Sequence, residues 1–217
     1  VHNGSGFGFV VGSRLPDRQG RTGVITTPHG TIRTPAFVAV GTKATVKSLL
    51  PESVAQLGAQ AVLANAYHLY LQPGPDIVEA AGGLGAFMHW PGPTFTDSGG
   101  FQVMSLGVGF KKVLAMNTAG LQSDDVIAPG KNRLATVDED GVTFKSHLDG
   151  ARHLITPERS TEIQRLLGSD IVMAFDELVP TTSTRDVQAA AMERSMRWAK
   201  RSRDAFLGGG AHADHVD

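Results

Sequence analysis

The stretch TPERSTEIQRLLGSDIVMAFD, Thr156–Asp176, contains one complete helix–strand unit of this 217-residue chain. Its first residue is a favoured N-cap, Pro157 suits the first position of a helix, and Gly168 is typical of the residue that follows one. The apolar run Ser169–Phe175 comes next and predicts a buried strand that ends at an aspartate. Helices that alternate with buried strands are the building units of α/β folds.

The same alternation occurs upstream and downstream of this unit. Pro35–Val40 is a continuous apolar run, which predicts a strand buried on both faces. A helix is predicted from Pro51 to Gly58, with Val54 and Leu57 on one face. The other predicted elements are the strands Ala61–Ala64 and Thr94–Thr96, a short helix at Asp76–Ala81, and a long helix from Thr184 to Phe206 with Val187, Ala190 and Ala191 on one face.

Buried strands that alternate with helices predict a parallel sheet, either open or closed into a barrel. We find four such units in residues 34–206. An eight-fold barrel needs eight units and about 250 residues. Residues 1–33 predict a β-rich preamble, and residues 107–155 predict an inserted β-hairpin or meander with turns at Asp140-Gly141 and Asp149-Gly150. Within the insertion, residues 107–133 are expected to form a loop, and residues 207–217 are expected to form a tail.

The composition excludes several classes of protein. The chain is 41% hydrophobic and 19% charged, which is typical of a globular protein. It has no cysteine, so it contains neither disulfides nor thiolate metal ligands. It has no apolar run of the roughly 18 residues that span a membrane and no signal-peptide pattern. We therefore expect a cytoplasmic protein without membrane contact. The net charge of −1 neither indicates nor excludes a nucleic-acid partner, so evidence for one must come from particular residues.

Three polar residues, Asn65, Asp97 and Asp176, stand at the carboxyl ends of predicted strands. Ligands and catalytic groups gather at that edge of α/β sheets. Carboxylates there can act as general acid or base, or can accept hydrogen bonds from the N–H groups of a purine-like ring. Equally, each residue could simply cap the next helix or order a turn.

The segment Asp97-Ser98-Gly99-Gly100-Phe101 is the most specific of these signals. Glycines allow backbone amides to approach a ligand closely, and a neighbouring aromatic ring offers a stacking face for a flat base. This combination predicts a pocket for a planar polar ring.

Other charged groups have less specific interpretations. Asp176 and Glu177 are adjacent, but adjacent side chains on an extended backbone point to opposite faces, so one acid in a pocket is favoured over a metal pair. His147 and His153 could face each other across a hairpin, although two ligands are too few for a typical zinc site. The last helix carries a row of cations that could contact phosphates, with a solvated helix face as the simpler interpretation. These cations are Arg194, Arg197, Lys200, Arg201 and Arg203.

Taken together, these segments resemble the tRNA-guanine transglycosylase family, particularly its bacterial queuosine-pathway members, from about Arg21 to Phe206. Five stretches carry the resemblance in the family's order. They are RTPAFVAVGTKATV (Arg33–Val46), TFTDSGGFQVMSL (Thr94–Leu106), GVTFKSHLDG (Gly141–Gly150), PERSTEIQRLLGSDIVMAFDE (Pro157–Glu177) and MERSMRWAKRSRDAF (Met192–Phe206).

The resemblance implies a (β/α)8 TIM-barrel fold of which this chain is about the first half, the N-terminal part. It implies exchange of guanine in a tRNA anticodon arm for the deazaguanine preQ1 through a covalent enzyme–tRNA intermediate, in a homodimer. By this resemblance Asp97 is the acid/base aspartate, Asp176 reads the donor edge of the base, and the Asp97–Phe101 segment, including Ser98, Gly99 and Gly100, binds the base with Phe101 in the stacking position.

The chain also departs from the family pattern. Phe101 replaces a tyrosine and Leu178 replaces a cysteine of several bacterial relatives, which leaves open whether preQ1 or queuine is the incoming base. The nucleophilic aspartate and the Cys3His structural zinc site are expected downstream of residue 217, so we expect no metal or cofactor in this chain and no exchange activity from it alone.

Two other interpretations remain open. The chain could be a non-catalytic accessory subunit of a transglycosylase, which would need no finished base pocket. It could also be an unrelated barrel enzyme for a small carbonyl or phosphate substrate, although Lys43 and Lys47 form no arrangement that such an enzyme needs.

Overall fold

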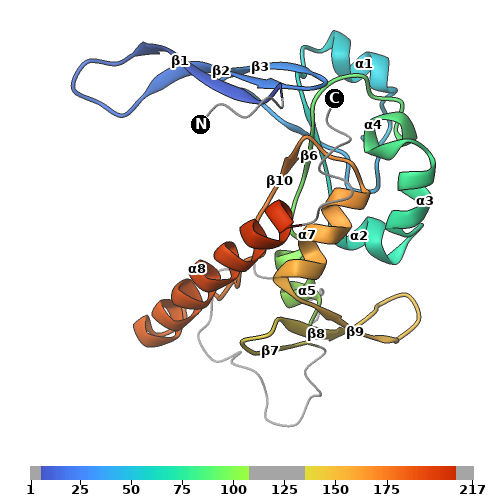
Figure 1. Ribbon diagram of the computed structural model, residues 1–217, viewed down its shortest axis with the longest axis vertical. Coiled ribbons are helices and arrows are strands. Elements are labelled where there is room, and N and C mark those ends of the chain that lie inside the picture. Colours follow the sequence, from blue (N-terminus) through green and yellow to red (C-terminus); the bar gives the residue numbers. More distant parts are fainter. Residues whose placement is uncertain (1–5, 108–134, 209–217) are drawn as a thin grey trace.

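The residues that the structure describes form an α/β structure with three separate sheets (Figure 1). The computed structural model describes residues 6–107 and 135–208. In this part of the chain, a parallel sheet lies between an antiparallel sheet at one end of the molecule and a second antiparallel sheet at the other end. The first antiparallel sheet consists of β1 (Gly8–Arg14), β2 (Arg21–Thr27) and β3 (Gly30–Thr34), and it corresponds to the predicted β-rich preamble.

The central sheet is parallel, as the alternation of strands and helices predicts. It has the order β10-β6-β5-β4, which follows the order of the strands along the chain and contains no switch point. It is open in the described residues, and no closed barrel is present among them. Its strands are short: β4 (Ala39–Val40), β5 (Val62–Ala64), β6 (Thr94–Thr96) and β10 (Ile171–Val172).

Helices cover one face of this sheet, and the main core lies between them and the strands. Side chains such as Val62 and Ala64 of β5 pack there against residues of the covering helices, including Val54, Leu69, Val78, Leu84 and Ile163. The helices are α1 (Pro51–Gln56), α2 (Ala66–Leu71), α3 (Pro75–Ala80), α4 (Gly83–Phe87) and α7 (Pro157–Leu166). One row of the strand register lies on the opposite face and contains Val40, Leu63, Phe95 and Ile171. These residues are more exposed, since Val40 is exposed and the other three are half-buried.

The predicted strand at Pro35–Val40 is wrong in length and in burial. Only Ala39–Val40 joins the sheet, while the side chains of Phe37 and Val40 are 80% and 58% exposed. β4 is an edge strand, and Pro35 has no N–H group to donate to a ladder. The apolar run therefore does not form a strand that is buried on both faces.

The predicted strand at Ser169–Phe175 is also shorter than expected, since β10 contains only Ile171 and Val172. The residues beyond β10 bond to side chains instead of to a neighbouring strand. The N–H group of Met173 donates to Gln164 Oε1, and the N–H group of Phe175 donates to Ser202 Oγ.

The helix signals of the central unit are confirmed. Thr156 caps α7 by accepting a hydrogen bond from the Arg159 N–H group at 3.1 Å, Pro157 begins the helix, and Gly168 has φ of 66°. α1 and α3 also form where they are predicted, although Leu57 is 76% exposed and does not share the buried face of Val54.

The long predicted helix is α8 (Arg185–Gly208), and its buried face differs from the expected one. Ala191 is buried, but Val187 is 48% exposed and Ala190 is exposed. The buried face consists of Ala191, Trp198 and Ser202. The first turns of α8 extend beyond the rest of the molecule, so their apolar residues have little to pack against (Figure 1).

The insertion forms the predicted meander, with β7 (Ala135–Val137), β8 (Val142–Lys145) and β9 (Arg152–Ile155) paired antiparallel. Both predicted turns lie between its strands. Most of the predicted 107–133 loop and of the 207–217 tail lies outside the described residues, while Gly107 ends α5 (Gly100–Gly107) and α8 reaches Gly208. Among the helices that the structure describes, none is long and apolar enough to cross a membrane.

Gly141 gives a direct test of this meander. A Cβ at this position would lie 2.2 Å from the carbonyl oxygen of Ile155, whereas a Cβ at Gly8 of β1 would have nothing within 4 Å. We expect Gly141→Ala to lower the free energy of unfolding by about 2 kcal/mol, because backbone atoms must move. Gly8→Ala should change it by less than about 0.5 kcal/mol. Urea unfolding of the 217-residue chain measures both, and equal midpoints for the two variants would contradict the described β8–β9 register.

Candidate functional site

The structure brings the three predicted strand-end residues together at the carboxyl edge of the parallel sheet. The side-chain amide of Asn65 donates to the Asp97 carboxylate, which also accepts from the Ala66 N–H group at 2.9 Å. Ser98 connects this pair to Asp176, because its hydroxyl donates to Asp176 Oδ1 at 3.3 Å. The site is therefore one cluster contributed by the segments that follow β5, β6 and β10.

Asn65 is both a helix cap and a partner of the carboxylate. Its Oδ1 atom accepts a hydrogen bond from the His68 N–H group at 3.1 Å, which caps α2. This bond orients the amide so that its Nδ2 group faces Asp97. The capping interpretation and the functional interpretation of Asn65 are thus compatible, because one amide has both a donor and an acceptor.

The electrostatics of Asp97 are those of a partly buried acid. Burial raises the pKa of its carboxyl group above the ordinary value, because desolvation disfavours the charged form. Hydrogen bonds from the Ala66 and Gly99 N–H groups and from the Gln102 and Asn65 side chains act in the opposite direction and do not cancel this rise in pKa. A carboxyl group in this state is suited to exchanging a proton with a bound ligand.

The two glycines after Ser98 allow a close approach within the site. Gly99 has φ of 78°, and a Cβ on it would lie 3.2 Å from the Cβ atom of Tyr67. A Cβ on Gly100 would lie 2.7 Å from the carbonyl oxygen of Asp176, so only glycine fits there. Phe101 follows at the start of α5 with its side chain 54% exposed.

Glu177, next to Asp176, is directed to a different partner. Its carboxylate pairs with Arg194 Nη1 at 2.5 Å, and its N–H group donates to Ser195 Oγ at 2.9 Å. The two adjacent acids therefore do not act as a pair. In the part of the chain that the structure describes, no group of three or more His, Cys, Asp or Glu side chains could hold a metal ion.

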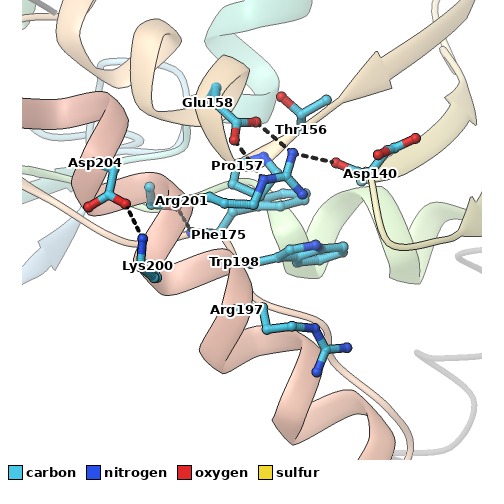
Figure 2. Close-up of polar contacts among 12 residues, drawn as sticks. Asp140, Thr156, Pro157, Glu158, Phe175, Arg197, Trp198, Lys200, Arg201 and Asp204 are labelled. Carbon is cyan, nitrogen blue, oxygen red and sulfur yellow. Dashed lines mark hydrogen bonds and ion pairs between the residues drawn. The ribbon is translucent and has the colours of Figure 1, made fainter. Parts of the chain in front are cut away.

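One face of α8 packs against the segment that carries Asp176 (Figure 2). The ring of Phe175 stacks on the indole of Trp198, with centroids 5.1 Å apart and an interplanar angle of 25°. The Trp198 Nε1 group donates to the carbonyl of Glu139, in the turn between β7 and β8. α8 thereby connects the end of the parallel sheet to the meander.

The five predicted cations of α8 are engaged in ion pairs, so they form no free phosphate site, and the side chains of Arg197, Lys200 and Arg203 are 51%, 72% and 67% exposed. Arg201 makes a bidentate pair with Glu158 of α7 at 2.6 and 2.8 Å and also donates to the Asp140 carbonyl (Figure 2). Arg197 makes a similar pair with Glu139. The other three cations also pair with carboxylates: Arg194 with Glu177 and Glu139, and Lys200 and Arg203 with Asp204.

His147 and His153 bond to tyrosines of α2 and not to each other. Tyr67 and His147 lie 3.0 Å apart between the Oη and Nδ1 atoms, and Tyr70 and His153 make the same contact at 3.0 Å. Burial raises the pKa of Tyr67 to about 12. The two pairs fix the meander against α2, which is the helix that Asn65 begins.

α2 was not predicted from the sequence, although a signal for it was present. Asn65 is a favoured N-cap, and Pro73 stops the helix a few residues later. Two further polar residues near the site, Ser160 and Gln164 on α7, were also missed, because polar helix residues are normally expected to face solvent.

Comparison with known proteins identifies a family for this chain. The family model described as queuine tRNA-ribosyltransferase matches residues 17–214. Proteins named queuine tRNA-ribosyltransferase are 52% identical over 200 residues in Zymomonas mobilis (92% of this chain, 45% of the relative) and 53% identical over 197 residues in a Ruegeria species (91% and 46%). One from Novosphingobium aromaticivorans is 52% identical over 208 residues (96% and 48%). The chain spans about half the length of these curated relatives, and it belongs to the queuine tRNA-ribosyltransferase family.

Proposed function

We propose that this chain provides the base-binding and acid/base part of a tRNA-guanine transglycosylase. That enzyme would exchange guanine at the anticodon wobble position of tRNA for a deazaguanine such as preQ1. The observation that supports this most strongly is the cluster at the carboxyl edge of the sheet. There the partly buried Asp97, held by Asn65, is connected through Ser98 to Asp176.

In this proposal Asp97 is the acid/base residue. Its raised pKa keeps a proton available nearer to neutral pH than an exposed aspartate would. The Asn65 amide and the Ala66 N–H group stabilise the charged form after the proton leaves. Proton transfer to or from a purine-like base at the edge of the sheet is the chemistry that such a group supports.

Asp176 is proposed to recognise the base. A carboxylate accepts hydrogen bonds, and guanine and preQ1 both present adjacent N–H donors on one edge of the ring. The loop Ser98–Gly100 would shape the floor of the pocket, and the exposed ring of Phe101 could stack on a bound base.

The remaining machinery is proposed to lie in segments that this chain does not contain. Half-length coverage of the relatives and a parallel sheet whose order follows the chain support the interpretation that residues 34–206 are about half of a (β/α)8 barrel. The nucleophilic aspartate that bonds to the ribose would be elsewhere. A Cys3His zinc site does not fit this chain, which has no cysteine, so no step is assigned to zinc. We propose homodimerisation and action on cytoplasmic tRNA for the whole enzyme.

Guanine binding tests the recognition role of Asp176. We expect Asp176→Asn to weaken the affinity of the chain for guanine by about ten- to a hundredfold, since a hydrogen bond to a charged acceptor contributes about 1.5–3 kcal/mol. Isothermal titration of the 217-residue chain with guanine measures this affinity, and adenine serves as the control base.

Asp186→Asn is the matched control, because Asp186 is an exposed aspartate in the first turn of α8 and should leave guanine affinity unchanged. A folded wild-type chain with no preference for guanine over adenine would remove the basis of the proposal. It would favour the alternative of a non-catalytic accessory subunit.

The raised pKa of Asp97 predicts a pH dependence of stability. A carboxyl group whose pKa is higher in the folded state than in the unfolded state stabilises the fold fully below its unfolded pKa, and this stabilisation is lost as pH rises through the folded pKa. Between pH 4 and pH 7, wild type should therefore lose stability relative to Asp97→Asn, which does not titrate. Denaturant unfolding of both proteins over this pH range tests this prediction. If the difference between their free energies of unfolding stayed constant with pH, burial would not raise the pKa of Asp97.

The chain by itself should not exchange bases. Without a nucleophile for the ribose carbon, labelled guanine should not enter tRNA in its presence above the level of a no-protein control. Incorporation at the wobble position by the purified 217-residue chain would place the nucleophile within these residues and contradict this part of the proposal.

A further inference from the structure

The side chain of Gln164, on α7, lies at the centre of a buried hydrogen-bond network between the two carboxylate segments of the site. Gln164 is 0% exposed. Its side-chain amide makes two hydrogen bonds to the backbone of Met173. The Met173 N–H group donates to Oε1 at 2.9 Å, and Nε2 donates to the Met173 carbonyl at 2.8 Å. The amide thus replaces the ladder bonds that a neighbouring strand would make.

Its position matters because β10 ends at Val172 and Asp176 follows soon after. Ladder pairing with β6 stops at Val172, so the next residue of the chain is held by Gln164 instead of by the sheet. The hydrogen bonds from Gln164 to Met173 therefore fix the backbone at the start of the segment that leads to Asp176.

The same amide reaches the other carboxylate segment. Oε1 also accepts a hydrogen bond from the Thr96 hydroxyl at 3.0 Å, directly before Asp97. One turn earlier on α7, the Ser160 hydroxyl donates to the carbonyl of Ser98 at 2.8 Å, directly after Asp97. Nε2 of Gln164 completes the network with contacts of 3.3 Å to Ser160.

We propose that Ser160 and Gln164 are positioning residues that set the separation and orientation of Asp97 and Asp176, and thereby the affinity of the pocket for a guanine-type base. This inference rests on the proposed function for the identity of the ligand. Both oxygen lone pairs of the Gln164 amide have partners on the two segments, while its N–H groups donate to the Met173 carbonyl and to Ser160 of α7, so the network has one geometry in which all its groups are satisfied.

A purely structural role would have different consequences. If Gln164 only stabilised the helix packing, its loss would affect the whole chain, and its effect on binding would be independent of Asp176. If it positions the carboxylates, its loss should loosen the two site segments together. Its effect on binding should then depend on Asp176.

Gln164→Met tests this, because methionine is similar in length but has no amide. We expect guanine affinity to fall about tenfold, which is the scale of a small misplacement of binding groups. In an Asp176→Asn background the same substitution should cost less than about threefold, because the misplaced group is already absent. Equal losses in the two backgrounds would overturn the proposal.

Hydrogen exchange provides a measurement without ligand. Gln164→Met should speed amide exchange in residues 97–103 and 173–177 together, while β1, β2 and β3 keep their protection. Faster exchange over the whole chain, or only within α7, would overturn the positioning role.

Two further variants complete the design. Gln188→Met is the matched control, because Gln188 also donates to two carbonyls, those of Thr181 and Ser183, but on an exposed segment. Ser160→Ala is a milder change that leaves the Ser98 carbonyl without its donor and should give the same pattern even if Gln164→Met does not fold. If wild type binds no guanine while both segments loosen together, the proposed function fails and the positioning role stands.

Discussion

Two hydrogen bonds between the Gln164 amide and the backbone of Met173 join α7 to the residue that follows β10. β10 has only two residues, so its own ladder bonds do not reach Met173. Each strand of the parallel sheet contributes only two or three residues to the ladder. Short ladders leave backbone groups near the sheet in need of partners, and burying such groups without partners costs about 1–3 kcal/mol each. At both ends of the parallel sheet, side chains therefore make the hydrogen bonds that these backbone groups need.

At the amino end of the sheet, side chains also bond to backbone groups next to the strands. Asp170, whose side chain is 0% exposed, accepts hydrogen bonds from the N–H and hydroxyl groups of Thr94 and pairs with His29 of the first antiparallel sheet. This contact ties the N-terminal sheet to the start of β6. At the carboxyl end the tyrosines of α2 tie the meander in a similar way through His147 and His153. The parallel sheet is thus fixed at each end by an antiparallel sheet, and its carboxyl end carries the site carboxylates Asp97 and Asp176.

The candidate site holds a carboxyl group, that of Asp97, whose charged form is disfavoured by its burial. Desolvation works against ionised Asp97, and the surrounding donors only partly offset it. By contrast, Arg197 and Arg201 of α8 lie in exposed or half-exposed ion pairs, each of which contributes little to stability. The bidentate pairs of Arg197 with Glu139 and of Arg201 with Glu158 hold α8 in one orientation. In this orientation Trp198 and Ser202 face Phe175 and fix the segment before Asp176.

The sequence by itself determined the parallel α/β arrangement, the cap and the stop of α7, the turns of the meander and the position of Asp97 directly after a strand. These features depend on local rules, namely apolar runs, capping residues and turn residues, which act within a few positions of each other. Only the tertiary structure decided that Gln164 and Ser160 are buried, that Phe37 and Val187 are not, and that the α8 cations pair with carboxylates of the meander and α7. The physical reason is that a polar residue is buried only where a partner satisfies it. The partners of Ser160 and Arg201, for instance, lie 62 and 43 residues away along the chain, beyond the reach of any local pattern.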